Sequence, residues 1–287
     1  MMDDLFAETT DQLIGEGVLD KMRARVNGSE PVTYALDLTD SHVDLNPYIG
    51  KSLKLVFGGT IRCGHCGAVT PKSYQGLCYE HFMTLAQADN CMMSPEKCHL
   101  DQGTCREPEW AERVCQQPHY VYLANSSGIK VGITRIGQIP VRWLDQGATQ
   151  GLVIARVSSR RLSGLVEVIF KQQVADKTNW RAMLKQSADV EDMAARRDAL
   201  FAQCAEPLQA LIAEYGRQHV QLIRQGDVFD FEYPVQEYPE KVSSLSFDKQ
   251  PEIGGVLLGI KGQYLIFDKG VVNIRRHSGY QVQLFAS

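Results

Sequence analysis

Hydrophobic and polar positions alternate near both ends of the chain, and this period of two predicts antiparallel β-strands. Near the N-terminus, the expected strands are 18–26, 32–38, 53–57 and 60–62. Near the C-terminus, they are 228–232, 255–260, 263–267, 271–274 and 281–285. Residues 1–16 form a polar leader with a weak helical pattern, and Asn27-Gly28 and Gly58-Gly59 are the expected turns of the first β unit.

The middle of the chain mixes the strand period with the helix period. Strands at 120–124 and 129–133 are expected to form a hairpin. The next expected elements are a helix at 140–147, a strand at 152–157 and a helix that Ser158 or Ser159 caps and that runs to about Asp176. The longest helical pattern covers 189–215 with a break at Pro207, and a short helix is expected at 218–224. The sequence therefore predicts the order hairpin, helix, strand, helix.

These patterns predict an α+β fold. The chain of 287 residues is long enough for two or three hydrophobic cores. The expected segments are an N-terminal β unit (1–62), a Cys-rich segment (63–119), a central module (120–185), a helical extension (186–226) and a C-terminal β unit (227–287).

The composition is that of an ordinary globular protein, with 44% hydrophobic and 22% charged residues. It excludes intrinsic disorder and a collagen-like chain. No uncharged apolar stretch approaches the ~20 residues that a membrane helix needs. The first residues are acidic where a secretory signal would be basic and then apolar. We therefore expect a cytoplasmic protein that does not contact a membrane.

Positive charge is concentrated in the central module. The whole chain has a net charge of −4, which argues against a nonspecific nucleic-acid binder. Residues 120–185, however, contain ten Lys and Arg against three Asp and Glu. Such a basic region is typical of a polyanion-binding surface, and a solvated helix face explains it equally well. If DNA or RNA binds there, Arg135, Arg160 and Arg161 are the expected contacts.

The spacing of cysteines predicts a zinc site. Cys63 and Cys66 form a Cys-x-x-Cys pair, and Cys78 with His81 forms a second pair at the start of an expected helix. Two such pairs supply the four tetrahedral ligands of a structural zinc ion. The alternative, a redox-active Cys-x-x-Cys or unlinked thiols, leaves the second pair unexplained.

Four further cysteines predict a second zinc ion. They are Cys91, Cys98, Cys105 and Cys115, with His99 and His119 nearby. Their spacing matches no standard zinc finger, and buried free thiols are the alternative. Both sites have enough protein ligands to be closed, so their zinc is expected to be structural. The Cys-rich segment also offers a surface for a protein partner.

The central module resembles the GIY-YIG nuclease superfamily. The resemblance rests on Tyr120-Val121-Tyr122, on Lys130-Val131-Gly132-Ile133-Thr134, and on Arg142 and Glu167 at later positions. It covers about 65 residues and implies a small antiparallel sheet flanked by helices, with the Cys-rich segment as a zinc-containing insert.

The resemblance implies a catalytic role for Tyr122, Arg142 and Glu167. Cleavage of a phosphodiester needs a carboxylate that holds magnesium or manganese, an arginine for developing negative charge, and a phenol or water that passes protons. Glu167 would be that carboxylate, Arg142 the arginine and Tyr122 the phenol. Lys130 replaces the second tyrosine of the family motif, so it would stabilise charge rather than act as a base.

Structural roles explain the same residues in another way. Tyr122 on a strand can be a packed aromatic, Arg142 can stack on Trp143, and Gly132 can permit close packing. Glu167 lies in an apolar stretch of helix, where it either faces water or has a partner.

A longer resemblance identifies the chain as a member of an uncharacterised bacterial family, domain of unknown function 2797. The segments that carry it are Ser94–His99, Gly103–Glu107, Val121–Ala124, Arg142–Ala148, Gly259–Phe267 and Asn273–Arg275. This family has no assigned activity.

Two functions remain open from the sequence. The first is a zinc-containing nucleic-acid-binding protein that acts as a metal-dependent endonuclease of the GIY-YIG type. The alternative is a noncatalytic zinc-finger interaction protein that uses the nuclease-like core as a scaffold, because a fold alone does not determine function.

Overall fold

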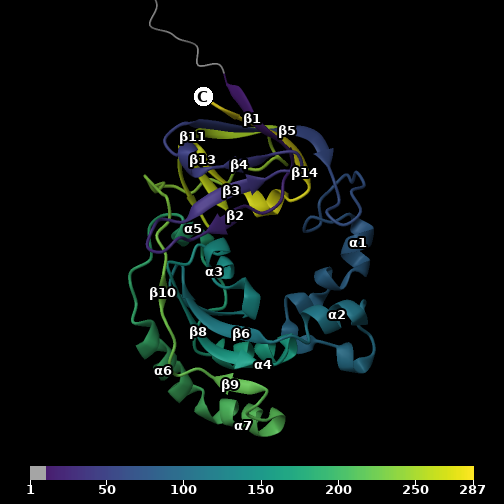
Figure 1. The fold of residues 1–287 in the computed structure, drawn as a ribbon, viewed down its shortest axis with the longest axis vertical. Helices are drawn as coiled ribbons and strands as arrows, with labels where there is room; N and C mark the ends of the chain where they lie inside the picture. Colours follow the sequence, from purple (N-terminus) through teal and green to yellow (C-terminus); the bar gives the residue numbers. More distant parts are fainter. Residues whose placement is uncertain (1–10) are drawn as a thin grey trace, which may run out of the picture. The chain divides into compact units, whose positions relative to one another are not determined.

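The computed structural model describes residues 11–287 and divides the chain into two compact units (Figure 1). The described part of unit 1 comprises residues 11–24, 33–78 and 234–287. Unit 2 comprises residues 25–32 and 79–233. Both ends of the chain therefore contribute to unit 1, and unit 2 contains the central module and most of the Cys-rich segment.

Unit 1 is built on a six-stranded antiparallel sheet (Figure 1). Its strand order is β1 (Gln12–Val18), β14 (Tyr280–Ala286), β5 (Ser52–Ile61), β11 (Glu252–Lys261), β12 (Tyr264–Phe267) and β13 (Gly270–Asn273). A second sheet contains β2 (Arg23–Arg25), β3 (Thr33–Asp37) and β4 (His42–Asp44). Along β14 buried and outer positions alternate, as expected for a strand with one face on the core.

Three expectations for the N-terminal β unit were wrong. Residues 12–16, expected in a weakly helical leader, belong to β1 (Gln12–Val18), while residues 1–10 of that leader lie outside the described residues. The strand expected at 18–26 is shortened to β2. The expected turn at Gly58-Gly59 is absent because β5 runs through both glycines and pairs with β14. The changes at β1 and β5 follow from pairing with β14, a strand from the distant C-terminal end of the sequence, whereas β2 pairs with β3.

The core of unit 1 contains a buried lysine. Lys261 at the end of β11 has no exposed surface, and its Nζ lies 3.5 Å from the Tyr238 hydroxyl and 5.2 Å from the centre of the Tyr238 ring. Burial lowers the pKa of Lys261 to about 8. Burial removes water from the charged ammonium and so favours its neutral form.

Replacing Lys261 by methionine is expected to stabilise unit 1 at neutral pH. Methionine keeps most of the aliphatic volume and removes the charge, and lowering a pKa from 10.5 to about 8 corresponds to an upper bound of about 3 kcal/mol. Unfolded lysine binds its proton more tightly than folded lysine, so wild-type stability rises relative to the variant as pH increases from 8 towards 10.5. Urea unfolding at pH 7.5 and pH 10 measures the difference in the free energy of unfolding between the variant and wild type. A difference that is larger at pH 10 contradicts this account.

Unit 2 is built on a second antiparallel sheet (Figure 1). Its strand order is β10 (Phe229–Asp230), β8 (Gln150–Val157), β6 (His119–Asn125) and β7 (Ile129–Arg135), and β9 (Val220–Leu222) also pairs with β8. Its main helices are α3 (Val141–Asp145), α4 (Arg160–Phe170), α5 (Trp180–Met183), α6 (Met193–Gln203) and α7 (Ala205–Tyr215). The predicted order hairpin, helix, strand, helix is confirmed in β6, β7, α3, β8 and α4.

Helix α4 covers the sheet of unit 2 with one apolar face. Leu162, Val166 and Phe170 recur at intervals of four and belong to the same buried cluster as Ile154 of β8. Ser159 begins the helix, because its hydroxyl accepts a hydrogen bond from the backbone N–H of Leu162. The helix ends at Phe170, earlier than the predicted Asp176.

Two other predictions for unit 2 were wrong. Residues 220–222 form β9 rather than part of a helix, because this short segment pairs with the edge of β8. The long helical pattern is divided into α6 and α7 at Cys204. Pro207 lies in the first turn of α7, where the missing N–H of proline costs no helical hydrogen bond.

The Cys-rich segment has little regular structure. It contains α1 (Tyr79–Thr84), α2 (Pro108–Val114) and four short 3-10 turns, which are η2 (Ala86–Ala88), η3 (Asn90–Met92), η4 (Pro95–Lys97) and η5 (Leu100–Gln102). Turn η4 packs against α4. Among the described residues, no helix has both the length and the hydrophobicity required to span a bilayer.

Candidate functional site

The predicted first metal site forms a compact cluster. The ligand atoms of Cys63, Cys66, Cys78 and His81 all lie within 4.8 Å of one another. Three thiols and one imidazole at this spacing can hold a metal ion such as zinc. The set supplies four protein ligands, which is the number found in closed structural sites.

Local backbone geometry prepares these ligands. Gly67 has a φ of 71°, and its N–H donates to the carbonyl of Cys63, which closes the Cys-x-x-Cys turn. The Ser73 hydroxyl donates to the carbonyl of Ser278, so the loop between the two ligand pairs is fixed to unit 1. Cys78 immediately precedes α1, and His81 lies in its first turn.

The electrostatics of Cys63 suit a metal-bound thiolate. Burial raises the pKa of Cys63, but backbone N–H groups of Cys66, Cys78 and His65 outweigh burial and lower the pKa to about 6. Backbone donors that stabilise a sulfur anion also orient it for a metal ion.

The other four cysteines are arranged less compactly. Burial raises the pKa of Cys91 to about 12, and charges on Asp89, Cys98 and Cys115 act in the same direction. Burial also raises the pKa of Cys115, which interacts with Cys98 and Cys105. The four thiols therefore lie in one neighbourhood. The compact group there, with ligand atoms within 4.8 Å, is Asp89, Cys91 and His99.

Two histidines near these thiols have different surroundings. His99 Nδ1 lies 2.8 Å from the Thr104 hydroxyl, and its Nε2 lies 3.5 Å from Asp89. His119 is fully buried, with Nδ1 2.7 Å from the Gln117 carbonyl and with no partner for Nε2. Burial lowers the pKa of His119 to about 4, so it is neutral at physiological pH.

The structure places Tyr122 in the interior of unit 2. Its side chain has no exposed surface, and its hydroxyl donates to Gln146 Oε1 at 3.1 Å. A Cβ on Gly132 would lie 2.6 Å from the Tyr122 hydroxyl, so glycine is required opposite this ring. Trp143 packs edge-on against it with ring centres 5.8 Å apart. Gly132 therefore has the packing role considered from the sequence.

Arg142 and Lys130 lie around Tyr122. Burial raises the pKa of Tyr122, and Arg142 opposes this shift through its charge and a hydrogen bond. Burial lowers the pKa of Lys130 to about 8, with the charge of Arg142 adding to the effect. Lys130 is 5% exposed and, within residues 11–287, its ammonium makes no hydrogen bond or ion pair.

Glu167 belongs to the same neighbourhood. It is 8% exposed, and burial raises its pKa against the opposing charge of Lys171, whose Nζ lies 3.4 Å from Glu167 Oε2. Charge interactions connect Glu167 with Tyr122 and Lys130. The residues implied by the resemblance therefore lie close together, and Glu167 has a partner rather than facing open water.

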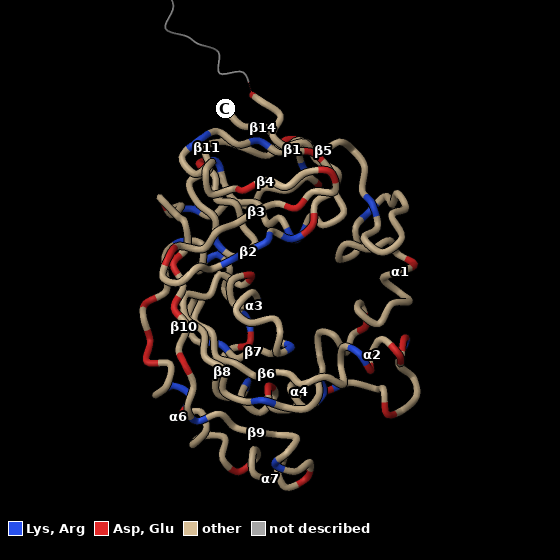
Figure 2. Tube along the Cα trace, in the orientation of Figure 1, with Lys and Arg blue, Asp and Glu red and all other residues tan. Residues whose placement is uncertain are grey.

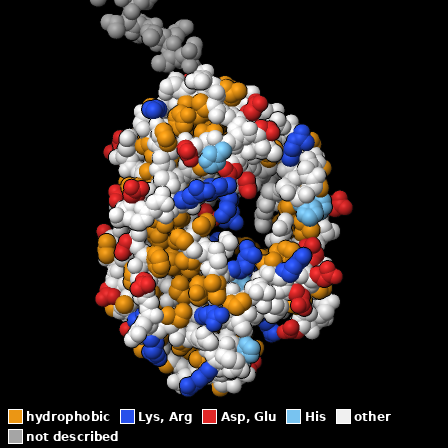
Figure 3. Space-filling view, in the orientation of Figure 1, with side chains coloured by type: hydrophobic (Ala, Val, Ile, Leu, Met, Phe, Trp, Pro, Cys, Tyr) orange, Lys and Arg blue, Asp and Glu red, His pale blue; other side chains and the backbone are white. Residues whose placement is uncertain are grey.

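The three predicted nucleic-acid contacts are placed differently. Arg135 is exposed at the end of β7. Arg160 is half-buried and donates from Nη2 to the carbonyl of Met92, and Arg161 pairs with Asp101 at 2.6 Å. Figure 2 colours all Lys and Arg along the trace, and on the face drawn in Figure 3 basic and acidic side chains both occur. Arg160 and Arg161 thus hold the Cys-rich segment against α4.

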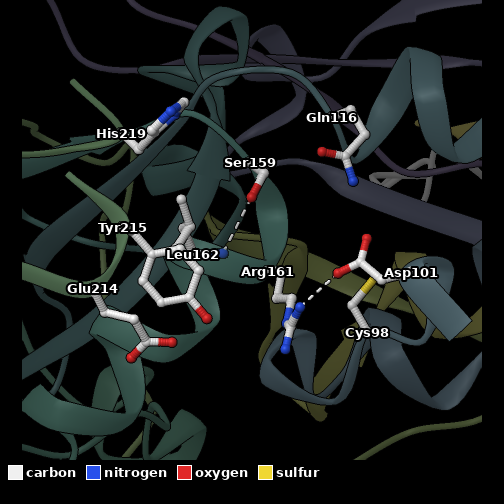
Figure 4. Close-up of a pocket in the computed structure, with 9 residues that line it drawn as sticks. All are labelled: Cys98, Asp101, Gln116, Ser159, Arg161, Leu162, Glu214, Tyr215 and His219. Carbon is white, nitrogen blue, oxygen red and sulfur yellow. Dashed lines mark hydrogen bonds and ion pairs between the residues drawn. The ribbon is translucent and has the colours of Figure 1, made fainter. Parts of the chain in front are cut away.

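A pocket of about 310 Å³ lies beside the start of α4 (Figure 4). Its lining residues are Cys98, Asp101, Gln116, Ser159, Arg161, Leu162, Glu214, Tyr215 and His219. The ion pair between Arg161 and Asp101 lies on its wall, and the Ser159 hydroxyl is occupied by the cap of the helix. None of the residues implied by the resemblance lines this pocket.

Tyr122, Lys130, Arg142 and Glu167 form what we call the buried cluster of unit 2. Sequence reasoning missed several residues that surround it. Gln146 follows Arg142 by four residues, and Lys171 follows Glu167 by four, so helical spacing could have revealed both. Glu96 was not identified, although its charge acts on Glu167. It comes from η4 in the Cys-rich segment, and no local pattern connects η4 with α4.

The fold and the cysteine–histidine cluster define the class of this protein: a mixed α+β protein with several antiparallel sheets and a site suited to a metal such as zinc. The chain belongs to the family described as protein of unknown function (DUF2797), which matches residues 50–282 and confirms the family expected from the sequence. No curated protein matches the chain. No solved structure matches it either, so the resemblance to GIY-YIG nucleases stays a prediction.

Proposed function

We propose that this protein binds nucleic acid and cleaves phosphodiester bonds with the aid of a divalent cation. One observation carries the proposal: the guanidinium groups of Arg142 and Arg160 each keep a buried Nε donor without an acceptor, and the ammonium of Lys130 lies in the same neighbourhood. The Nε atoms of Arg142 and Arg160 are buried without a partner, and the Lys130 ammonium makes no hydrogen bond or ion pair in the described chain. Charge interactions join Lys130 to Arg142, and Arg142 to Arg160.

Unsatisfied cationic donors indicate an anionic ligand. A buried donor without an acceptor costs roughly 1–3 kcal/mol, and more when it is charged. A phosphate group supplies several acceptor oxygens and negative charge, which matches guanidinium and ammonium donors. The phosphodiester backbone of DNA or RNA therefore fits this cluster.

The residues around the proposed phosphate site have different chemical roles. Arg142 and Lys130 bind the phosphate and stabilise its developing charge, and Tyr122 together with Gln146 orients Arg142. Glu167 fits a magnesium or manganese ligand, because its carboxylate is buried and only Oε2 is engaged by Lys171. When bound, such a cation would polarise the phosphate and activate water.

In this proposal, the cysteine and histidine ligands bind zinc ions that have a structural role. The cluster of Cys63, Cys66, Cys78 and His81 offers no position for a substrate once its four ligands hold a metal. We also propose a second structural zinc ion among Cys91, Cys98, Cys105 and Cys115, supported by the mutual charge interactions of these thiols.

A noncatalytic scaffold remains the second candidate function. Arg160 and Arg161 use their guanidinium groups within the protein, and Tyr122 is inaccessible to solvent. In that case the Cys-rich segment binds a protein partner, and the buried cluster stabilises the fold.

Replacing Lys130 by methionine is expected to weaken nucleic-acid binding about tenfold while stabilising the free protein. The variant removes a buried charge that lowers stability and also removes a phosphate contact. Labelled duplex, branched and single-stranded DNA and RNA are titrated at several salt concentrations, beside thermal unfolding. Lys185→Met, which alters an exposed lysine of the same module, is the control.

The two candidate functions give different results in this titration. Phosphate binding requires a lower affinity and a shallower salt dependence in Lys130→Met than in Lys185→Met. If wild-type protein binds none of these nucleic acids at low salt, the scaffold function replaces the proposed one.

A further inference from the structure

A carboxylate of the Cys-rich segment reaches the buried cluster of unit 2. Turn η4 packs against α4 at Gly164, where an added Cβ would lie 2.5 Å from the backbone nitrogen of Glu96 and 2.7 Å from the Cβ of Pro95. Only glycine permits this approach of two backbones. The contact brings Glu96 beside the helix that carries Glu167.

Glu96 has a carboxylate oxygen without a partner. Its Oε2 is buried and accepts no hydrogen bond within residues 11–287. Burial raises the pKa of Glu167, and the negative charge of Glu96 contributes to this shift. Such a charge interaction between two carboxylates is unfavourable unless a proton or a cation compensates it.

Within residues 11–287, the ammonium that pairs with Glu167 belongs to Lys171, which does not contact Glu96. Lys171 Nζ lies 3.4 Å from Glu167 Oε2 and 3.2 Å from Asp176 Oδ2. This lysine is therefore shared between Glu167 and Asp176, while Glu96 Oε2 accepts no hydrogen bond within the described residues. Glu167 and Glu96 therefore offer carboxylate oxygens as ligands for a hard cation, and Oε2 of Glu96 has no other partner in the described part of the chain.

We propose that Glu96 and Glu167 together bind the divalent cation, magnesium or manganese, of the candidate phosphodiester site. Both cations prefer carboxylate oxygens, and two carboxylates with bound water are a common set for them. The inference rests on the proposed function, because Glu167 is the carboxylate already assigned to that cation. It makes the Cys-rich segment a part of the site rather than a separate module.

Several contacts hold the segment in the position that this role requires. The backbone N–H of Arg160 donates to the Cys115 carbonyl at 2.7 Å, and Arg160 Nη2 donates to the Met92 carbonyl at 2.7 Å. Arg161 pairs with Asp101 from the same segment. The first turn of α4 thus fixes both sides of η4, and this fixes the position of Glu96.

Manganese binding by the zinc-loaded full chain tests the proposal. Glu96→Gln is expected to lower manganese affinity about 10- to 100-fold, and Glu167→Gln by at least as much. Glu109→Gln changes an exposed carboxylate of the same segment and is expected to bind like wild type. Titrations followed by calorimetry or by the electron paramagnetic resonance of free manganese give the affinities.

The pattern of results separates this inference from the proposed function. Loss of binding in Glu167→Gln but not in Glu96→Gln overturns the role of Glu96 and leaves Glu167 as the ligand. Unchanged binding in both variants overturns the cation site and the proposed cleavage with it.

Thermal unfolding distinguishes a ligand from a structural residue. Without manganese, Glu96→Gln is expected to unfold at the same or a higher temperature than wild type, because it removes a repulsion. With manganese, its stabilisation is expected to be smaller. A variant that unfolds far earlier without the metal would assign Glu96 to folding instead. Glu96→Asp, which keeps the charge on a shorter side chain, is expected to bind manganese between wild type and Glu96→Gln.

Discussion

Glutamine in place of Glu167 is expected to abolish cleavage of nucleic acid while leaving binding intact or stronger. Glutamine has nearly the same shape as glutamate but lacks the charge that holds a divalent cation. Removing a negative charge beside Lys130 and Arg142 also reduces repulsion of phosphate. Loss of turnover with retained binding is therefore the result that follows from the structure.

The stability of this variant separates a lost ligand from a damaged fold. Burial raises the pKa of Glu167, so the carboxylate is costly to bury in its charged form. Lys171 keeps its ion pair with Asp176 when Glu167 becomes neutral. The unfolding temperature without added cation is thus expected to stay close to that of wild type.

Cleavage assays with labelled duplex, branched and single-stranded substrates measure this effect in magnesium and in manganese. Glu206→Gln, which changes an exposed carboxylate on α7, serves as the matched control and is expected to cleave like wild type. Equal activity in wild type and Glu167→Gln would mean that the activity comes from another site or from a contaminant.

Local sequence patterns predicted the fold well where strands and helices depend on near neighbours. The hairpin of β6 and β7 and the apolar face of α4 follow from alternation and helical spacing within a few residues. β1 could not be predicted in this way, because it becomes a strand by pairing with β14 from the other end of the chain. β9 became a strand through pairing with β8 for the same reason.

The residues of the candidate site show the same difference between local and distant contacts. Motif spacing identified the cluster of Cys63, Cys66, Cys78 and His81, because all four ligands lie within one short stretch of sequence. Charge counting could not show that Arg160 and Arg161 bind groups within the protein, since Met92 and Asp101 approach them from another segment. Glu96 was missed because packing, not sequence spacing, brings it to Glu167.

Replacing Cys66 by serine is expected to remove one zinc ion per chain and to destabilise the protein far more than an ordinary surface substitution. The thiol of Cys66 is exposed, so exchange for a hydroxyl leaves no cavity and breaks no core packing. A large loss of stability must therefore arise from the metal. Structural zinc binding in small domains contributes roughly 10–16 kcal/mol of apparent free energy, and this energy is coupled to folding.

Elemental analysis and thermal unfolding of protein purified without added metal measure this effect, with Cys204→Ser as the control. Cys204 is a buried thiol of the α6–α7 junction, so its serine variant is expected to lose some stability but no zinc. Wild type is expected to contain close to two zinc ions, one at the cluster around Cys66 and one among the remaining cysteines of the segment. A wild-type content near one zinc ion per chain contradicts the second site. An unchanged zinc content in Cys66→Ser contradicts the first site. After chelation, added zinc is expected to restore the unfolding temperature of wild type but not that of Cys66→Ser.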